Sequence, residues 1–268
     1  MHDEYVDLSQ KVEWSSPREQ KAAIKFFNAA FTAEESGLRQ AHQLADEVAT
    51  WDADLAEVLR LYGNEEGWHR ELVSEYLSYL GGSVQPMGRV TRTFYKLHSR
   101  ATRMETIVLV NLMFEVIGAT TYRMALSRVT HPTARHMLTI LTRDESFHVP
   151  LNVHFLLHIF RRDPRARDRV RPIFYLLFFS LLALPSASRP KAQAFDGIRA
   201  TDLRRGYAEQ LGSLFLNEPD LGLIPPLWAL RLLGLDPHQL KKENLLTVSS
   251  IEAAERAADR TQVQVTAL

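Results

Sequence analysis

The hydrophobic positions of this chain recur about every 3.6 residues, a period typical of amphipathic α-helices, and no stretch shows the alternation of a β-strand. The sequence therefore predicts an all-α protein. Its expected helical regions are about 18–60, a helix between Gly63-Asn64 and Gly81-Gly82, 101–128, 133–160, 200–216 and 225–234.

Capping and breaking residues suggest where these helices begin and end. Ser15-Ser16-Pro17 is a typical helix start, and glycines near position 81 are a typical end. Whether 18–60 forms one helix or two segments broken near Thr50 to Asp54 stays open. Gly63-Asn64 is expected to separate this region from the next helix, and Pro150 is expected to kink the helix that contains it.

Two Glu-x-x-His motifs are the clearest chemical signal. Glu66 and His69 form the first, and Glu145 and His148 form the second; only these two of the ten histidines follow a glutamate at this spacing. Residues three apart share one face of a helix, so each motif directs a carboxylate and an imidazole to one side.

A further glutamate precedes each motif at a similar distance. Glu34 lies 32 residues before Glu66 (34 to 66), and Glu115 lies 30 residues before Glu145 (115 to 145). Glu35, the neighbour of Glu34, is the alternative first glutamate. Two helices with one glutamate each and two with Glu-x-x-His are the ligand pattern of four-helix bundles that bind a pair of metal ions. The repeated spacing predicts two similar helical hairpins.

The surroundings of these residues favour metal ligands over solvated side chains. Glu115 lies within 109–117, among the most apolar stretches of the chain, where an uncompensated carboxylate would cost several kcal/mol. Glu65 and Asp144 directly precede the motif glutamates and are expected to orient ligating histidines from outside the metal shell.

Composition narrows the chemistry. The chain has no cysteine, which excludes disulfides and sulfur-ligated metals, and carboxylate with imidazole suits iron or manganese. Any electron must come from a separate donor. The formal net charge of zero argues against an obligatory nucleic-acid partner. The first residues lack the features of a secretory signal, so a cytoplasmic location is expected.

The motifs resemble those of the ferritin-like di-iron carboxylate superfamily over about 30–160. Residues 65–69, Glu-Glu-Gly-Trp-His, are similar to the second-helix motif of soluble acyl-carrier-protein desaturases. Residues 143–148, and Glu115 followed by Tyr122, are similar to parts of aldehyde-deformylating oxygenases.

The resemblance implies a single domain, 1–268, with a ferritin-like four-helix bundle over about 18–160 and additional C-terminal helices over 161–268. It implies two iron ions, with manganese or a mixed pair as alternatives. Their ligands would be Glu34, Glu66, His69, Glu115, Glu145 and His148.

The implied activity is O2-dependent oxidation of a small, largely apolar substrate, with electrons from a ferredoxin or a similar reductase. Tyr122 is either a catalytic hydrogen-bond donor or redox group, or a packed core tyrosine. The alternative function is iron storage in a ferritin-like protein without an organic substrate.

Six arginines within 161–171 precede an apolar run, 173–184. The arginines are either a docking surface for an anionic partner or a solvated helix end, which the dipole of the preceding helix favours. The run spans about 18 Å as a helix, too short to cross a membrane. It predicts a packed helix that lines a substrate channel or a homodimer interface.

Overall fold

The computed structural model describes residues 6–9, 11–14, 16–86, 102–183, 194 and 197–243. Its regular elements are helices, with no strand among these residues, so the all-α prediction is confirmed. The chain divides into two compact units, Met1–Met104 and Glu105–Leu268, and each is described by itself. Most of the predicted connection 83–99 and of the region from Lys241 onward lies outside the described residues.

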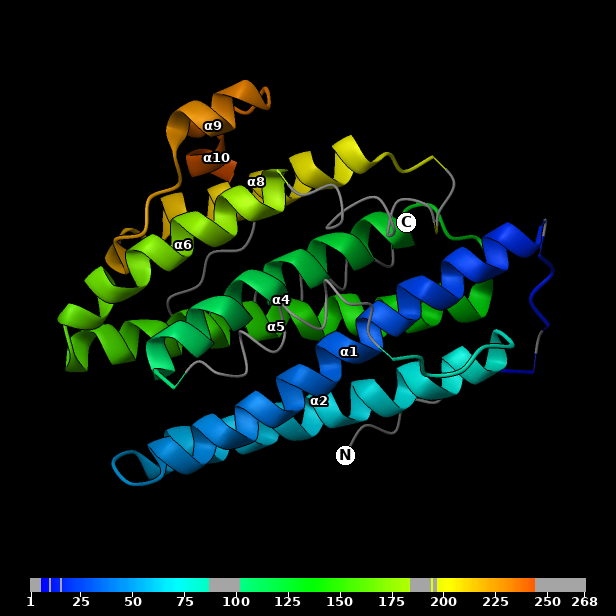
Figure 1. Cartoon of the computed structure of the whole chain (residues 1–268), viewed down its shortest axis with the longest axis horizontal. Helices are drawn as coiled ribbons and strands as arrows, with labels where there is room; N and C mark the ends of the chain where they lie inside the picture. The colour runs from blue at the N-terminus through cyan, green and yellow to red at the C-terminus, as the bar shows by residue number, and fades with distance from the viewer. Residues whose placement is uncertain are drawn as a thin grey trace. The chain divides into compact units, whose positions relative to one another are not determined.

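The first unit is a pair of antiparallel helices, α1 (Pro17–Val48) and α2 (Ala53–Tyr79), which lie side by side in Figure 1. Ser16 caps α1, because its hydroxyl accepts a hydrogen bond from the backbone N–H three residues later at 3.2 Å. Asp52 caps α2 in the same way at 2.9 Å. The region 18–60 is therefore two helical segments.

The predicted boundary at Gly63-Asn64 is wrong, because both residues lie inside α2. Gly63 instead permits close packing between the two helices. A Cβ added to it would lie 3.1 Å from Ala41 Cβ and 3.1 Å from the ring of His42. The side-chain cap at Asp52 sets the start of the helix, and the glycine meets a packing requirement.

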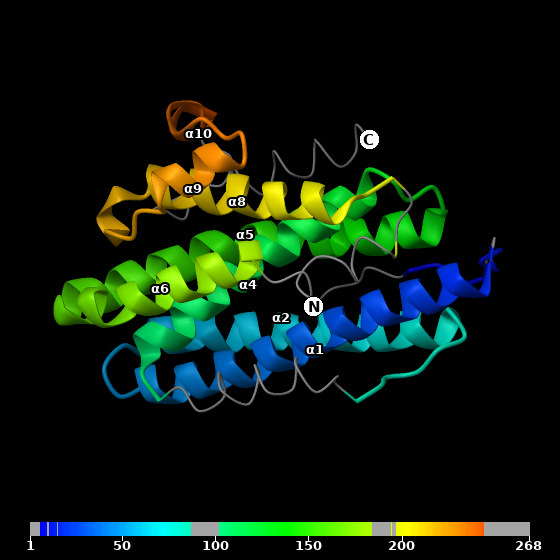
Figure 2. The same cartoon turned by 45° about the horizontal axis from the view of Figure 1, so that its top comes forward.

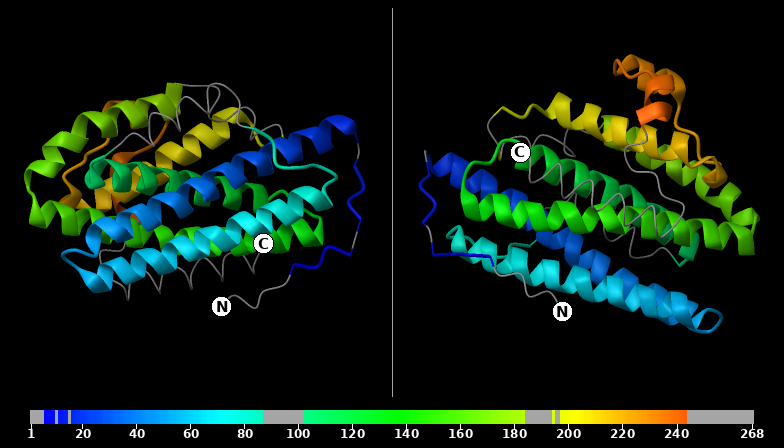
Figure 3. Two further views of the ribbon diagram at one scale, coloured as in Figure 1. Left: turned by 60° about the horizontal axis from the view of Figure 1, so that its bottom comes forward. Right: turned by 180° about the vertical axis from the view of Figure 1, so that it is seen from behind.

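The second unit contains four long helices that run in alternating directions (Figure 2 and Figure 3). They are α4 (Met104–Leu126), α5 (Pro132–Arg162), α6 (Arg165–Ala183) and α8 (Ala200–Asn217). The short elements η2 (Pro219–Leu221), α9 (Leu227–Leu232) and α10 (Pro237–Glu243) follow. The helices expected beyond residue 160 thus belong to the same compact unit as α4 and α5.

Buried contacts join α8 to both α4 and α6. The hydroxyls of Thr121 on α4 and Tyr207 on α8 lie 2.8 Å apart within the core. The rings of Phe174 on α6 and Phe215 on α8 pack edge to face, with centroids 4.6 Å apart. The apolar run therefore forms a packed helix, as expected, although Leu176 on its outer face remains exposed.

Helix α4 is apolar around nearly its whole circumference. Among the described residues it is the one helix long and apolar enough, by length and composition, to cross a membrane. However, 78% of its most apolar window is buried inside the protein, as expected of a central core helix. Glu115 is buried on this helix, so its carboxylate requires compensation from polar or cationic groups.

Two arginines of the 161–171 segment make specific contacts within the fold. Arg169 donates to the buried carboxylate of Glu105 and to Asp163, both at 2.7 Å. The hydrogen bond from Arg169 holds the pKa of Asp163 below its usual value. Arg167 lies over the ring of Phe160, with its guanidinium carbon 5.3 Å from the centroid. Arg169 and Arg167 therefore stabilise the packing of α6 against α4 and α5.

Replacing Arg169 with Ala is expected to lower the thermal unfolding midpoint, because Glu105 would stay buried without its cation. The matched control is Arg171→Ala, which removes an exposed pair with Asp168 at 3.2 Å and should leave the midpoint nearly unchanged. Differential scanning calorimetry measures both. Equal midpoints for the two variants would contradict the stabilising role of Arg169.

Candidate metal centre

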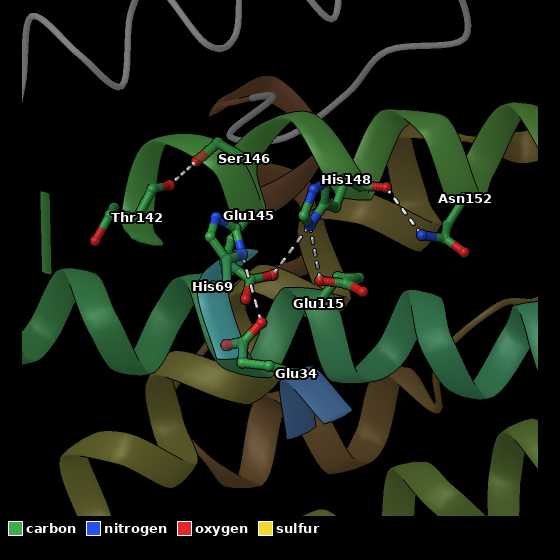
Figure 4. Close-up of polar contacts among 8 residues, drawn as sticks. All are labelled: Glu34, His69, Glu115, Thr142, Glu145, Ser146, His148 and Asn152. Atoms are coloured by element: carbon green, nitrogen blue, oxygen red, sulfur yellow. Dashed lines mark hydrogen bonds and ion pairs between the residues drawn. The ribbon is translucent and has the colours of Figure 1, made fainter. Parts of the chain in front are cut away.

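The first unit brings together three of the predicted ligands. Glu34 on α1 and Glu66 and His69 on α2 are all buried, with His69 fully inaccessible. His69 Nδ1 lies 3.4 Å from Glu34 Oε2 (Figure 4), and the three side chains offer ligand atoms within 4.8 Å of one another. Glu35 instead forms a surface pair with Arg39 at 3.7 Å, so Glu34 is the glutamate beside the motif.

The second unit repeats this arrangement. Glu115 on α4 and Glu145 and His148 on α5 are buried, and His148 is fully inaccessible. His148 Nδ1 lies 3.6 Å from Glu115 Oε2 and 3.8 Å from Glu145 Oε2, as the dashed lines in Figure 4 mark. Each unit therefore contains one group of two carboxylates and one imidazole. We call each group a half-site.

A glycine one turn after the first glutamate makes room for the second in each half-site. A Cβ added to Gly37 would lie 2.6 Å from Glu66 Oε2, closer than real contacts allow. A Cβ added to Gly118 would lie 3.3 Å from Glu145 Oε1, a tight contact. Glu-x-x-Gly occurs at both Glu34 and Glu115, so the sequence carries a signal for both glycines.

Helix α5 lacks one backbone hydrogen bond close to His148. Pro150 has no N–H to donate to the carbonyl of Ser146, yet the helix continues to Arg162. The Asn152 amide donates to the carbonyl of His148 at 3.0 Å, and the Ser146 hydroxyl donates to the carbonyl of Thr142 at 2.7 Å. These side-chain bonds to backbone carbonyls support the helix on both sides of His148 (Figure 4).

The donor chemistry of each half-site fits a divalent transition metal. Carboxylate oxygens are hard ligands and imidazole is intermediate, a combination suited to iron or manganese. Four buried carboxylates and two buried imidazoles in one chain also require compensation, which divalent cations supply. The buried groups can therefore hold metal ions.

The remaining predicted site residues have less defined roles. Tyr122 is buried on α4, two turns after Glu115. Asp144 is buried, and its carboxylate accepts a hydrogen bond from Arg143 Nε at 2.6 Å. Glu65 is half-buried on α2. The catalytic role of Tyr122 and the orienting roles of Asp144 and Glu65 stay predictions.

Comparisons with known proteins identify neither a family nor a function for this chain. No protein-family model matches this chain. No curated protein and no solved structure matches it either. The arguments for function therefore rest on the half-sites and on the resemblance of their motifs.

Replacing Gly37 with Ala is expected to weaken metal binding by at least about tenfold while the helices remain folded. The added methyl would displace the flexible Glu66 carboxylate. Mutations of residues that position a metal ligand typically lower the metal affinity by about 10–100-fold. Competition with a chelator of known affinity measures the change. Gly118→Ala should have a smaller effect, because its methyl requires a shift of only a few tenths of an ångström.

The matched control is Gly67→Ala, also within a helix, whose methyl would meet only Leu38 at 3.5 Å, an ordinary contact. This change should leave metal affinity intact and raise the free energy of unfolding by about 0.5–1 kcal/mol, because alanine favours helix over glycine. Equal metal affinity in the Gly37 and Gly67 variants would contradict the role of Gly37.

Proposed function

We propose that the two half-sites together bind a pair of iron ions in a ferritin-like four-helix bundle formed by α1, α2, α4 and α5. The protein would use this centre for O2-dependent oxidation of a small, largely apolar substrate. Manganese or a mixed pair is the alternative metal content. The proposal includes a cytoplasmic location. It also includes a ferredoxin or a similar reductase as the electron donor, because the chain has no cysteine for redox chemistry of its own.

The repeated geometry of the two half-sites carries the proposal. Each half has a glutamate on its first helix, a glycine one turn later and a Glu-x-x-His on its second helix. In each, the histidine Nδ1 lies within 3.6 Å of the first glutamate. Isolated surface glutamates would show neither this burial nor this repetition. A symmetric pair of ions is the ligand that such a donor arrangement suits.

Iron bound by these residues would supply the capacity to bind and reduce O2, and the protein would control where that chemistry occurs. Gly37 and Gly118 leave the space that the carboxylates of Glu66 and Glu145 occupy, so these side chains would be held beside the ions. The histidines come from helices that hold them fully buried. Apolar neighbours of Glu115 on α4, including Val116, exclude water and favour an apolar substrate.

Iron storage is the second function considered. It uses the same type of centre but requires no organic substrate. The presence of α6, α8, α9 and α10 in the unit that holds Glu115 favours the oxygenase, because a storage subunit needs no such additional helices. Tests with candidate substrates would identify the substrate and the type of reaction, which is hydroxylation, desaturation, deformylation or N-oxidation.

Replacing His69 or His148 with Ala is expected to remove both metal ions, because the two half-sites are proposed to bind the ions as a pair, so that loss of one ligand would weaken the whole centre. Wild type should hold two irons per chain by elemental analysis after anaerobic loading, and each variant should hold fewer than one. His154→Ala, an exposed histidine on the same helix as His148, is the control and should retain two.

The pattern of loss distinguishes a shared centre from two separate sites. Independent half-sites would lose one ion in each variant and retain the other. Full metal content in both variants would refute the ligand assignment.

Anaerobic protein loaded with two Fe(II) is expected to consume O2 in a single turnover. An oxygenase should do so faster when its apolar substrate is present and should form an oxidised organic product. Rapid-mixing absorption spectroscopy and mass spectrometry measure these outcomes across a panel of alkyl acids, aldehydes and amines. Ferroxidase turnover that no panel member changes, with growth of an iron mineral, would favour storage instead.

A further inference from the structure

A cleft of about 290 Å3 lies between α4 and α8 within the second unit. Its walls carry polar and charged side chains, including Thr120 and Arg123 from α4 and Arg205, Glu209 and Gln210 from α8. Beside the cleft the two helices pack closely at Gly206. A Cβ added to this glycine would lie 3.2 Å from side-chain atoms of both Thr120 and Met124. The cleft involves none of the predicted metal ligands.

Arg123 is the unusual residue of this cleft. Its Nε is buried and donates no hydrogen bond, and the side chain forms no ion pair with any residue that the structure describes. Burial lowers the pKa of this guanidinium below its usual value, because no nearby anion offsets the lost hydration. Arg123 as a whole is half-buried, but a guanidinium whose Nε is shielded from water is normally paired, so we expect a ligand as its partner.

The other charges of the cleft leave an excess of positive charge. Asp202 is already engaged by Arg199, which donates to its two oxygens at 2.9 and 3.0 Å. Neither Arg205 nor Glu209 forms an ion pair within the described part of the chain. Two cations, Arg123 and Arg205, thus face one unneutralised carboxylate, and a ligand with a single negative charge would balance them.

Gln210 narrows the ligand chemistry further. Its Oε1 atom is buried and accepts no hydrogen bond from any residue in the described part of the chain. A ligand hydroxyl can donate to this oxygen while the ligand carboxylate receives the planar N–H fork of Arg123. The volume of the cleft suits a compound of a few carbon atoms rather than a drug-sized molecule.

We propose that the α4–α8 cleft binds a small hydroxycarboxylate, with Arg123 pairing its carboxylate and Gln210 accepting from its hydroxyl. This site is separate from the proposed function of the half-sites, since no step of the binding involves a metal. Arg205, which is exposed, adds long-range attraction for the anion.

Isothermal titration of the full-length protein with lactate, propionate and inorganic phosphate tests the proposal. Lactate should bind more tightly than propionate, which has the same carboxylate but no hydroxyl, and more tightly than phosphate. Arg123→Gln should weaken lactate binding by about tenfold or more, because a charge-assisted bidentate contact is lost. Gln210→Leu should reduce the difference between lactate and propionate.

Two further variants keep the test independent of folding. Arg205→Gln changes an exposed side chain and should weaken binding about two- to threefold. Arg204→Gln, on the same helix but outside the cleft, is the matched control and should not change binding. Absence of lactate binding to wild type, or equal binding by wild type and Arg123→Gln, would overturn the proposal. Tighter binding of phosphate than of lactate would overturn the carboxylate assignment.

Discussion

Burial of two carboxylates beside one imidazole, in each of two helical pairs, is the constraint on which the rest of this protein depends. In the first unit His69 lies 3.4 Å from Glu34, and in the second His148 lies 3.6 Å from Glu115. Such groups lose much of their hydration when they are buried. If stability alone mattered, apolar residues would be more favourable at these positions. Buried groups of these donor types in both units can hold metal ions, which would supply the compensating charge.

The helices around these groups are adapted to hold them. Gly37 and Gly118 make room for the carboxylates of Glu66 and Glu145, where any other residue would crowd the oxygens. Both glycines lie inside long helices, where glycine is unfavourable by about 1 kcal/mol relative to alanine. Pro150 weakens α5 in the turn after His148. The sequence thus accepts local instability where the half-sites require space, and packing elsewhere offsets it.

That packing is concentrated in the second unit. Helix α4 is central and apolar, and α8 binds it through the buried hydroxyl pair of Thr121 and Tyr207. Arg169 gives the one buried carboxylate near the start of α4, Glu105, a cation from α6. Arg123, in contrast, has no such anion among the residues that the structure describes. The same helix therefore carries a satisfied charge at one end, a candidate metal ligand in its middle and a candidate ligand-binding arginine near its other end.

The sequence by itself determined the helical class, most helix ranges and the grouping of Glu66 with His69 and of Glu145 with His148. These features are local, because helical periodicity fixes which residues three apart share a face. The sequence also suggested the family resemblance and the metal identity, which stay predictions.

Only the tertiary structure decided contacts between residues far apart in the chain. It placed Glu34 rather than Glu35 beside His69, turned Gly63 from an expected boundary into a packing position, and paired Arg169 with Glu105 across 64 residues (105 to 169). A phase difference of one residue moves a helical side chain by about 100°, so periodicity alone could not separate neighbouring glutamates. Which helices meet, and therefore which buried charge finds a partner, depends on packing that no local pattern encodes.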